Sequence, residues 1–448
     1  MKNKRMSLWL LTLCFAGIYG QQPAEKYDFT LEEAVQFALD NNRTSKNAAL
    51  DIEAAKKQKW ETTTMGLPKI DGKIDYQRFL KQQVTLMPAE FFGGQPGEFI
   101  DAVFGTKQNA SASATLSQLI FDGSYLVGLQ SAKVYLQISN LLKEKNDVDL
   151  RKTVVDAYAN VLLAEETIKI LQENKSVLQK NLNETQAMFD NGLGEEESVE
   201  QLQITLANIN NNLNNTIRLH DLSKKMLNIT LGLSLDDAVT LTDRLDALAQ
   251  ASVAQSIAND TDFNIENNID YRIASNNLRS QELLLKYEKS QSLPKLNAFI
   301  NGAYNAYNDE FTFLQRNQRW FGSSLVGVSL DIPIFSSGMR SSRVQRFRIE
   351  LDKSKNDFDQ AKQQLRLAHS QALSNLQFAV EENQTFKENL ELAKRIEQKN
   401  QIKFTEGLAT SFDLRQAQLQ LYSAQQDYLQ SMVNVLNKKE ELNALQNK

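Results

Sequence analysis

The chain has 448 residues and a formal net charge of −5, with acidic and basic side chains mixed along its length. This mildly acidic balance gives no reason to expect a nucleic acid as a partner. Only one cysteine, Cys14, and two histidines, His220 and His369, are present. With so few cysteines and histidines, the chain can hardly form disulfides, zinc clusters or a histidine-based catalytic site. We therefore expect no cofactor, no metal site and no enzymatic activity. We interpret both histidines as solvated helix residues.

The first 20 residues have the pattern of a secretory signal peptide. A basic head precedes an apolar stretch over residues 8–18 and a small residue, Gly20, where cleavage would occur. The apolar stretch is too short to span a bilayer. Removal of residues 1–20 takes away three basic residues and no acidic ones, which changes the net charge from −5 to −8. Lipidation of Cys14 is the alternative, although Leu13 is not the small residue that a lipoprotein signal would have there.

Proline usage indicates where long helices are allowed. The six prolines lie at positions 23, 68, 88, 96, 294 and 333. Because proline breaks helix interiors, the intervals 97–293 and 334–448 are free to be helical over great lengths. We also predict shorter helices at about residues 30–62 and 262–290, each just before a Leu-Pro pair.

Segments with an alternation of period two lie between the predicted helices. The stretch "KIDGKIDYQ" alternates apolar or small residues with charged ones, and "NASASATLSQ" alternates alanine and leucine with hydroxyl residues. We predict four strands, near residues 69–79, 108–119, 295–307 and 322–333. Each has about ten residues, the length of a strand that crosses a bilayer in an outer-membrane barrel. The alternative is a soluble sheet with two different faces.

The connections between paired strands are rich in aromatic residues, which fits a girdle at the membrane interface. They are Phe91, Phe92, Phe99 and Phe104 in the first connection, and Tyr307, Phe311, Phe313, Trp320 and Phe321 in the second. Four strands cannot close a membrane barrel, since the smallest known barrels use eight. An open edge in lipid would leave backbone groups unsatisfied. The strands must therefore pair with those of other subunits, in a number that the periodicity does not choose.

A heptad pattern of apolar residues follows each pair of strands. It runs over residues 150–189 and returns over residues 344–379 and 414–435. A sustained seven-residue repeat predicts coiled-coil packing rather than a globular core. We therefore predict two long helical hairpins, over residues 124–232 and 338–446.

The hairpins turn at "DNGLGEEES" and "TEGLATSFD". Gly192 and Gly407 suit the left-handed position that ends a helix. Ser198 or Ser411 is expected to cap the helix that follows.

Three pairs of similar words, in the same order, indicate an internal duplication. "GLPKI" (66–70) returns as "SLPKL" (292–296), "TLSQLIFDGS" (115–124) as "SLDIPIFSSG" (329–338), and "MFDNGLGEEESVEQLQ" (188–203) as "KFTEGLATSFDLRQAQ" (403–418). Ordered words at offsets of 226, 214 and 215 argue for two copies of one large unit. The predicted organisation is a signal peptide (1–20), a first repeat (21–232), a linker (233–262) and a second repeat (263–448).

The two repeats resemble the TolC-like outer membrane efflux proteins. In each repeat the order is helix, "LP", strand, loop, strand, "[IL]F-x-x-G", long helix, "[FY]-x-x-GL" turn and helix. "FTLEEAVQFALDNN" (29–42) is similar to that family's opening helix, and the match covers roughly residues 28–446. The resemblance implies a mixed, mainly helical fold. It implies a homotrimer in which several subunits share a trans-membrane β-barrel of twelve strands, continued by a coiled-coil α-helical barrel. A small mixed belt around the tunnel is expected from residues 232–262 and the C-terminal end.

The function that the resemblance implies is a passive exit duct of a tripartite efflux or type I secretion system. The duct is expected in the lipid of the outer membrane and extends into the periplasm. An inner-membrane pump, of the RND or ABC type, and a periplasmic adaptor (membrane fusion protein) would deliver the substrate. Drugs, metals, dyes and proteins are all open as cargo. The alternative is a periplasmic coiled-coil adaptor or holdase without a membrane barrel.

In the family, the tunnel closes at its periplasmic tip, where the inter-helix turns lie. Asp413 corresponds to the aspartate after the second turn, and three copies would form an acidic ring that attracts cations. The alternative is an exposed residue in a helix's first turn, favoured by the helix dipole. Glu195, Glu196 and Glu197 are further candidates for the aperture, with a solvated charge run as the alternative.

Two further features of the tip follow from the resemblance. The turns Gly192–Leu193 and Gly407–Leu408 match the motifs at which adaptors dock tip to tip. Family members also hold the tip shut with an aspartate after the first turn and with a tyrosine, an arginine and a further aspartate around the second. The residues at these places here are Ser198, Phe404, Ala409 and Gln416. A charge-paired lock of that form is therefore not expected.

Overall fold

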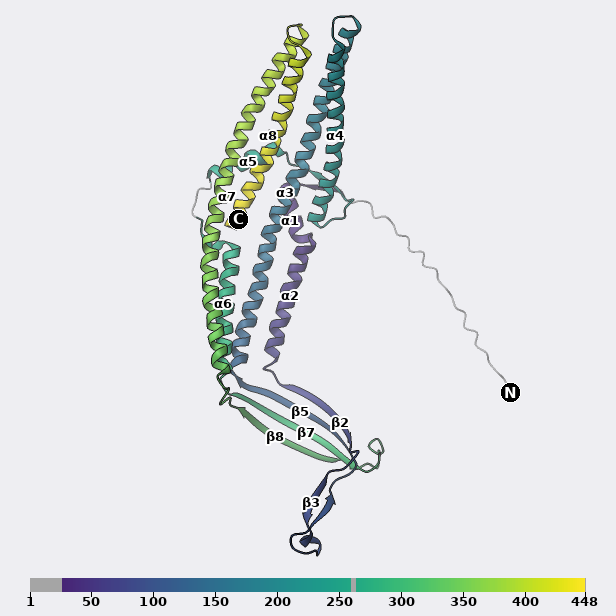
Figure 1. Ribbon diagram of the computed structural model, residues 1–448, viewed down its shortest axis with the longest axis vertical. Helices are drawn as coiled ribbons and strands as arrows, with labels where there is room; N and C mark the ends of the chain where they lie inside the picture. Colours follow the sequence, from purple (N-terminus) through teal and green to yellow (C-terminus); the bar gives the residue numbers. More distant parts are fainter. Residues whose placement is uncertain (1–25, 259–262, 448) are drawn as a thin grey trace, which may run out of the picture. The chain divides into compact units, whose positions relative to one another are not determined.

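A computed structural model describes residues 26–258 and 263–447 (Figure 1). The expected signal peptide and Cys14 lie outside the described residues. Helices predominate, which confirms the prediction of a mixed, mainly helical fold. The chain divides into two compact units. We call them the hairpin unit (Met1–Arg43, Asp149–Thr261 and Ala372–Leu442) and the sheet unit (Thr44–Val148, Asp262–Gln371 and Asn443–Lys448).

Four long helices follow the two pairs of strands in the chain. The first two are α3 (Gly123–Asp190) and α4 (Glu196–Leu231). The other two are α7 (Met339–Thr405) and α8 (Ser411–Gln446). Helices of 68 and 67 residues, as in α3 and α7, are several times the usual globular length. In Figure 1, the hairpin unit shows α4 returning beside α3 and α8 returning beside α7.

The core of the hairpin unit lies where small elements pack on these helices. Strands β1 (Lys26–Phe29) and β6 (Ala238–Leu241) pair in parallel, and helices α1 (Leu31–Asn41) and α5 (Leu245–Ala258) adjoin them. The fully buried Tyr158 of α3 donates a hydrogen bond from its hydroxyl to the carbonyl of Phe29, at 3.0 Å. The family resemblance implied a belt from residues 232–262 and the C-terminal end. β6 lies in that range, but its pairing with the N-terminal β1 was not expected.

The prediction of one helix over residues 30–62 is wrong, because the chain bends after α1 and restarts as α2 (Arg43–Thr64). Asn42 has an extended ψ of 136° at the break. Its side-chain amide donates to the carbonyl of Thr230, at 2.8 Å. A Cβ at Gly232 would lie 2.5 Å from the Asn41 carbonyl oxygen, so only glycine allows this approach. The break is therefore fixed by a distant segment of the chain.

The sheet unit contains an antiparallel four-stranded sheet in the order β2-β5-β7-β8 (Figure 1). The strands are β2 (Lys69–Arg78), β5 (Gln108–Asp122), β7 (Lys295–Asn308) and β8 (Phe321–Asp331). β5 extends three residues beyond the range expected for it, and β8 ends before Pro333. Within the described part of the chain, β2 and β8 each have one edge without a partner strand.

The register places residues of one kind on each face of the sheet. Ile70 pairs with Leu116, Leu116 with Ile300, and Ile300 with Val326, so these four side chains lie in one row across the sheet. This apolar face is exposed, with 77% of Val326 accessible. The opposite face carries two Lys–Asp ion pairs on β2 and a hydrogen bond from Asn301 to Thr115, at 2.7 Å. One face is thus apolar and the other polar.

A small hairpin that the sequence analysis did not predict lies between β2 and β5. It consists of β3 (Val84–Pro88) and β4 (Phe99–Val103), joined through a 3-10 turn at Ala89–Phe92. Phe91, Phe92 and Phe99 therefore lie in the connection between β2 and β5, as expected, but on a hairpin of their own, and the aromatic girdle stays a prediction. Aromatic residues in the second connection do lie at strand ends, and Phe311 and Phe313 pack on Tyr76 of β2.

Two further helices complete the sheet unit. α2 contacts α3, where the Tyr125 hydroxyl donates to the Thr63 carbonyl at 3.0 Å. α6 (Ile269–Ser290) follows a 3-10 turn at Ile265–Asn267 and contacts α3. The Lys286 ammonium of α6 donates a hydrogen bond to the Gln130 side chain of α3. Among the described helices, none has the length and hydropathy to span a membrane.

Candidate tip aperture and docking turns

The two inter-helix turns of the hairpin unit have the same backbone geometry. Gly192 and Gly407 have φ values of 76° and 74°, in the left-handed region. The amide of Leu193 donates to the Met188 carbonyl at 2.8 Å, and that of Leu408 to the Lys403 carbonyl at 2.7 Å. Together with the bonds that both glycine amides make within the last helical turn, this is the Schellman arrangement that ends a helix.

Each turn presents an apolar side chain to solvent. Leu193 is 81% exposed and Leu408 is 78% exposed. The backbone amides of these two leucines are bonded within the turns, while their side chains are free of the helix. The docking role that the family resemblance implies for these two leucines stays a prediction.

The helix α8 begins with a cap that differs from the expected one. Thr410, not Ser411, caps the helix, and its hydroxyl accepts from the Asp413 amide at 3.2 Å. The Asp413 carboxylate in turn accepts from the Thr410 amide at 3.0 Å and from its hydroxyl at 2.7 Å. This is a capping box, with aspartate in the place of the usual glutamate. The signal was present in the sequence as Thr-x-x-Asp over residues 410–413.

Ser198 does not cap α4 either. It lies in the first turn of the helix, and Glu195 occupies the cap position without a side-chain cap bond. The Ser411 hydroxyl instead donates to the Ser198 hydroxyl at 2.8 Å. Arg415 of α8 donates to the side chain of Gln201 of α4 close by. The starts of α4 and α8 are thus joined by uncharged acceptors rather than by a charge pair.

The acidic residues proposed for the aperture have different surroundings. Hydrogen bonds from Thr410 hold the pKa of Asp413 below its ordinary value, so its carboxylate is charged at neutral pH. Glu197 accepts a hydrogen bond from Gln201 at 2.8 Å, and Glu195 and Glu196 are exposed. All four lie at or just after the two turns. Phe404, in the place of the family's tyrosine, is buried.

A buried polar layer, which the sequence analysis missed, lies among α3, α7 and α8. We define it as Asn181, Thr185, Gln401, Gln418 and Tyr422. The amide of Asn181 donates to Gln401 at 3.3 Å. Gln418 is 1% exposed, and its side-chain amide lies beside the carboxyl of Glu397 without a hydrogen bond of normal geometry to any described residue. Polar groups inside a coiled coil fix the register of its helices at a cost in stability.

A groove beside the polar layer is lined by uncharged polar side chains together with the apolar Leu171, Ile204, Ile209 and Leu419 and with Arg415. It has a volume of about 730 Å³ and runs between α3, α4 and α8. Asn208, Asn212 and Asn215 of α4 line one side, and Gln416 and Gln426 of α8 line the other. The amide side chains of this surface can donate and accept hydrogen bonds.

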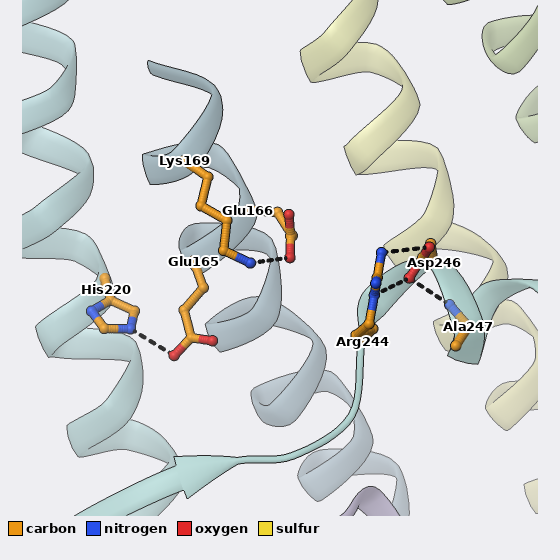
Figure 2. A network of polar contacts seen from close by, with 7 residues as sticks. All are labelled: Glu165, Glu166, Lys169, His220, Arg244, Asp246 and Ala247. Atoms are coloured by element: carbon orange, nitrogen blue, oxygen red, sulfur yellow. Dashed lines mark hydrogen bonds and ion pairs between the residues drawn. The ribbon is translucent and has the colours of Figure 1, made fainter. Parts of the chain in front are cut away.

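The histidines are not the solvated residues expected from the sequence. His220 is largely buried and contacts Glu165 at 3.1 Å, as Figure 2 shows beside the Lys169–Glu166 and Arg244–Asp246 pairs. His369 stacks on Phe263 with ring centroids 4.0 Å apart, and burial lowers its pKa. No cluster of potential metal ligands occurs in the part of the chain that the structure describes.

Comparison with solved structures shows the same fold in several outer membrane proteins. The outer membrane protein VceC of Vibrio cholerae is 13% identical with a TM-score of 0.71, over 93% of this chain and 96% of that one. The CmeC outer membrane channel of Campylobacter jejuni is 17% identical with a TM-score of 0.70, over 93% and 85%. The MtrE outer membrane channel of Neisseria gonorrhoeae, solved in an open state, is 14% identical with a TM-score of 0.67, over 93% and 88%.

The sequence matches a known family as a whole but no individual curated protein. A search of curated proteins finds no match. A family model described as "Outer membrane efflux protein" matches residues 34–232 and 264–448, which is most of the chain and includes both repeats. Members of this family are transport channels of the outer membrane and catalyse no reaction. The chain therefore belongs to the outer membrane efflux protein family.

Proposed function

We propose that three copies of this chain form a passive duct of a tripartite efflux or type I secretion system. In this proposal the duct lies in the outer membrane and extends into the periplasm. Its substrates arrive from an inner-membrane pump, of the RND or ABC type, through a periplasmic adaptor. Residues 21–232 and 263–448 are the two repeats of each subunit, joined by residues 233–262, and residues 1–20 direct export.

The observation that carries this proposal is the sheet β2-β5-β7-β8. Its apolar face exposes Ile70 and Ile74 of β2, Ile300 of β7, and Val326 and Val328 of β8, which is costly in water and favourable in lipid. Its two edges, β2 and β8, have no partner strand within the described chain, which lipid does not tolerate. Pairing of β8 with β2 of the next copy removes every edge. Four strands from each of three copies give a closed barrel of twelve strands, with the polar face turned to the lumen.

The tip turns support the proposed partners. Leu193 and Leu408 are exposed on two turns of identical geometry, as an adaptor that docks on both repeats would require. Asp413 and residues Glu195, Glu196 and Glu197 lie beside those turns. In the trimer they would form the charged aperture of the duct, and the negative charge of Asp413 at neutral pH gives that aperture a preference for cations.

Single cysteines on the two faces of the sheet test the proposal, because the chain has no cysteine after position 14. Val326→Cys and Asn301→Cys are compared in isolated outer membranes with a water-soluble maleimide. The Val326→Cys protein is expected to stay unlabelled until detergent is added, whereas the Asn301→Cys protein is labelled through the lumen. Equal labelling of the two variants, or recovery of the protein only in the soluble fraction, would contradict a membrane barrel.

A further inference from the structure

Basic residues concentrate where two helices of the sheet unit meet the same end of the sheet. The register pairs Asp122 with Lys295 and Lys295 with Asp331, and β2 begins at this end too. α2 ends at Thr64, shortly before β2, and α7 begins at Met339, shortly after β8. These two helices therefore adjoin the two free edges of the sheet, at one and the same end.

The start of α7 carries four arginines within its first ten residues: Arg340, Arg343, Arg346 and Arg348. Arg340 donates to the Pro333 carbonyl at 2.7 Å. The other three are exposed, and within the described chain none of them forms an ion pair with a carboxylate. The following acidic residue, Glu350, pairs with Lys353 instead.

The last part of α2 is also basic. Lys57 and Lys59 are exposed, and neither forms an ion pair within the part of the chain that the structure describes. Lys56 pairs with Glu53 at 2.6 Å, which leaves Glu61 as the one further carboxylate of this stretch. Trp60, between these lysines and the sheet, is 61% exposed.

The two clusters lie at the same depth along their helices. At 1.5 Å per residue, Arg343 to Arg348 lie roughly 6–14 Å from the α7 end that faces the sheet. By the same measure, Lys57 and Lys59 lie roughly 7–11 Å from the end of α2. The N-terminus of α7 also faces the sheet, so its dipole adds positive potential there.

The first copy of the proposed duplication forms the same strand-to-helix connection, from β5 to α3, without arginines at these positions. With the offset of 214 residues, the four arginines of α7 correspond to residues of α3 in the first repeat. Those residues are Leu126, Leu129, Ala132 and Val134. The basic cluster is therefore a property of the second repeat alone and calls for its own explanation.

We propose that the basic band formed by Arg343, Arg346 and Arg348 of α7 with Lys57 and Lys59 of α2 binds anionic phospholipid headgroups at the membrane surface. The inference rests on the proposed function, in which β8 of one copy pairs with β2 of the next. That pairing brings the basic start of one α7 beside the basic end of the neighbouring α2. The two clusters repel each other unless anions lie between them.

Lipid phosphates suit this position better than acidic protein side chains of the neighbouring copy. The helix that would adjoin α7 contributes mainly lysines at this depth, so charge complementarity points away from a protein partner. Arginine binds phosphate through two parallel hydrogen bonds, and basic residues next to a membrane surface attract anionic lipids. Trp60 lies at the level where aromatic rings anchor a protein at the membrane interface.

The test uses the full-length oligomer, purified with its lipid removed. It is reconstituted into vesicles of phosphatidylcholine alone or of phosphatidylcholine mixed with phosphatidylglycerol. The oligomer is then extracted again with detergent, and native mass spectrometry measures the lipid that stays bound to it. The oligomer is expected to retain phosphatidylglycerol at least about tenfold over phosphatidylcholine. The variant R343Q/R346Q/R348Q is expected to lose this preference, and K57Q/K59Q to weaken it. A matched variant on the same helix, K387Q/R395Q/K399Q, is expected to keep it.

The outcomes separate the inference from the proposed function. Insertion into both vesicle types without a headgroup preference, or an unchanged preference in R343Q/R346Q/R348Q, overturns the lipid site and leaves the duct intact. Failure to insert into either vesicle type overturns the duct and the lipid site with it. Displacement of the bound lipid by inorganic phosphate would show a site for the free anion and overturn the assignment to a lipid surface.

Discussion

Asp413 has an observed role in the cap of α8 and a proposed role in the aperture, and a single substitution separates them. Its carboxylate accepts two hydrogen bonds from Thr410 and completes the cap of α8. Its negative charge is the feature that the proposed aperture uses. Asparagine keeps an acceptor oxygen of the same reach but removes the charge, so a change at this residue acts mainly on electrostatics.

We expect Asp413→Asn to leave folding and assembly intact. It should weaken cation selectivity in planar bilayers and reduce block by multivalent cations added from the periplasmic side, because the charged ring is lost. The matched control changes Glu195, Glu196 and Glu197 to Gln and keeps Asp413. If the control abolishes selectivity while Asp413→Asn has no effect, the ring belongs to the first turn.

The capping box also predicts a pH dependence. Because the bonds from Thr410 lower the pKa of Asp413 in the folded state, the box contributes stability above the ordinary aspartate pKa of about 4. That contribution is lost as the pH falls through the lowered pKa. Asp413→Asn should therefore reduce the fall in thermal stability of the oligomer between neutral pH and about pH 3. An identical pH profile in both proteins would contradict the bonded carboxylate.

The buried amide of Gln418, which forms no hydrogen bond of normal geometry to any described residue, gives a prediction about stability. Leaving a buried polar group without a hydrogen bond costs about 1–3 kcal/mol. Gln418→Leu, of similar size, removes that cost and should raise the temperature at which the oligomer dissociates in detergent. Gln420→Leu, at an exposed position of the same helix, serves as the control and should give no gain. A lower dissociation temperature for Gln418→Leu would mean that the amide has a partner in the assembled protein.

At the scale of elements, the exposed apolar face of the sheet gives the clearest prediction about contact with lipid. Lysine at Ile300 of β7 or Val328 of β8 would place a charge on the apolar face. At the middle of a bilayer this costs about 2–4 kcal/mol per site, and the cost recurs in each subunit. Lysine at the neighbouring Asn301 or Ser329 lies on the polar face and should be tolerated. The yield of assembled oligomer in outer membranes measures the difference, and equal yields would mean that the sheet does not meet lipid.

Elements with a strong local pattern were predictable from the sequence, whereas those set by distant contacts were not. Alternation located the four strands of the sheet. Heptads located α3, α7 and α8, and the absence of proline together with the turn at Gly192 located α4. The break at Asn42 depends on a bond to Thr230, which is 188 residues away. β1 and β6 are only four residues each and pair across the whole first repeat, so neither carries a local signal.

The candidate site was predictable to a similar extent. Gly192 and Gly407 were located because a left-handed helix end favours glycine. The cap of α8 was misplaced by one residue, although Thr410 and Asp413 carry a capping-box spacing. Gln418 was missed because its burial depends on how α3, α7 and α8 pack, which the heptad pattern of α8 alone does not reveal.

At the scale of the whole molecule, the duplication explains the topology of the sheet. Each repeat contributes two adjacent strands, β2 and β5 from the first and β7 and β8 from the second, and the repeats join through β5 and β7. In the proposed function, the same edge-to-edge pairing continues from β8 to β2 of another copy and closes the proposed barrel. Strand length and alternation require at least eight strands and thus more than one chain, and the number three comes from the family resemblance.

The most direct test of the account is the number of chains in the particle that mild detergent extracts from the outer membrane. Native mass spectrometry of the full-length protein gives this number without any substitution. The account predicts three chains in each particle, since three copies supply the twelve strands of the proposed barrel. Particles of one or two chains, or recovery of the protein outside the outer membrane, would contradict it.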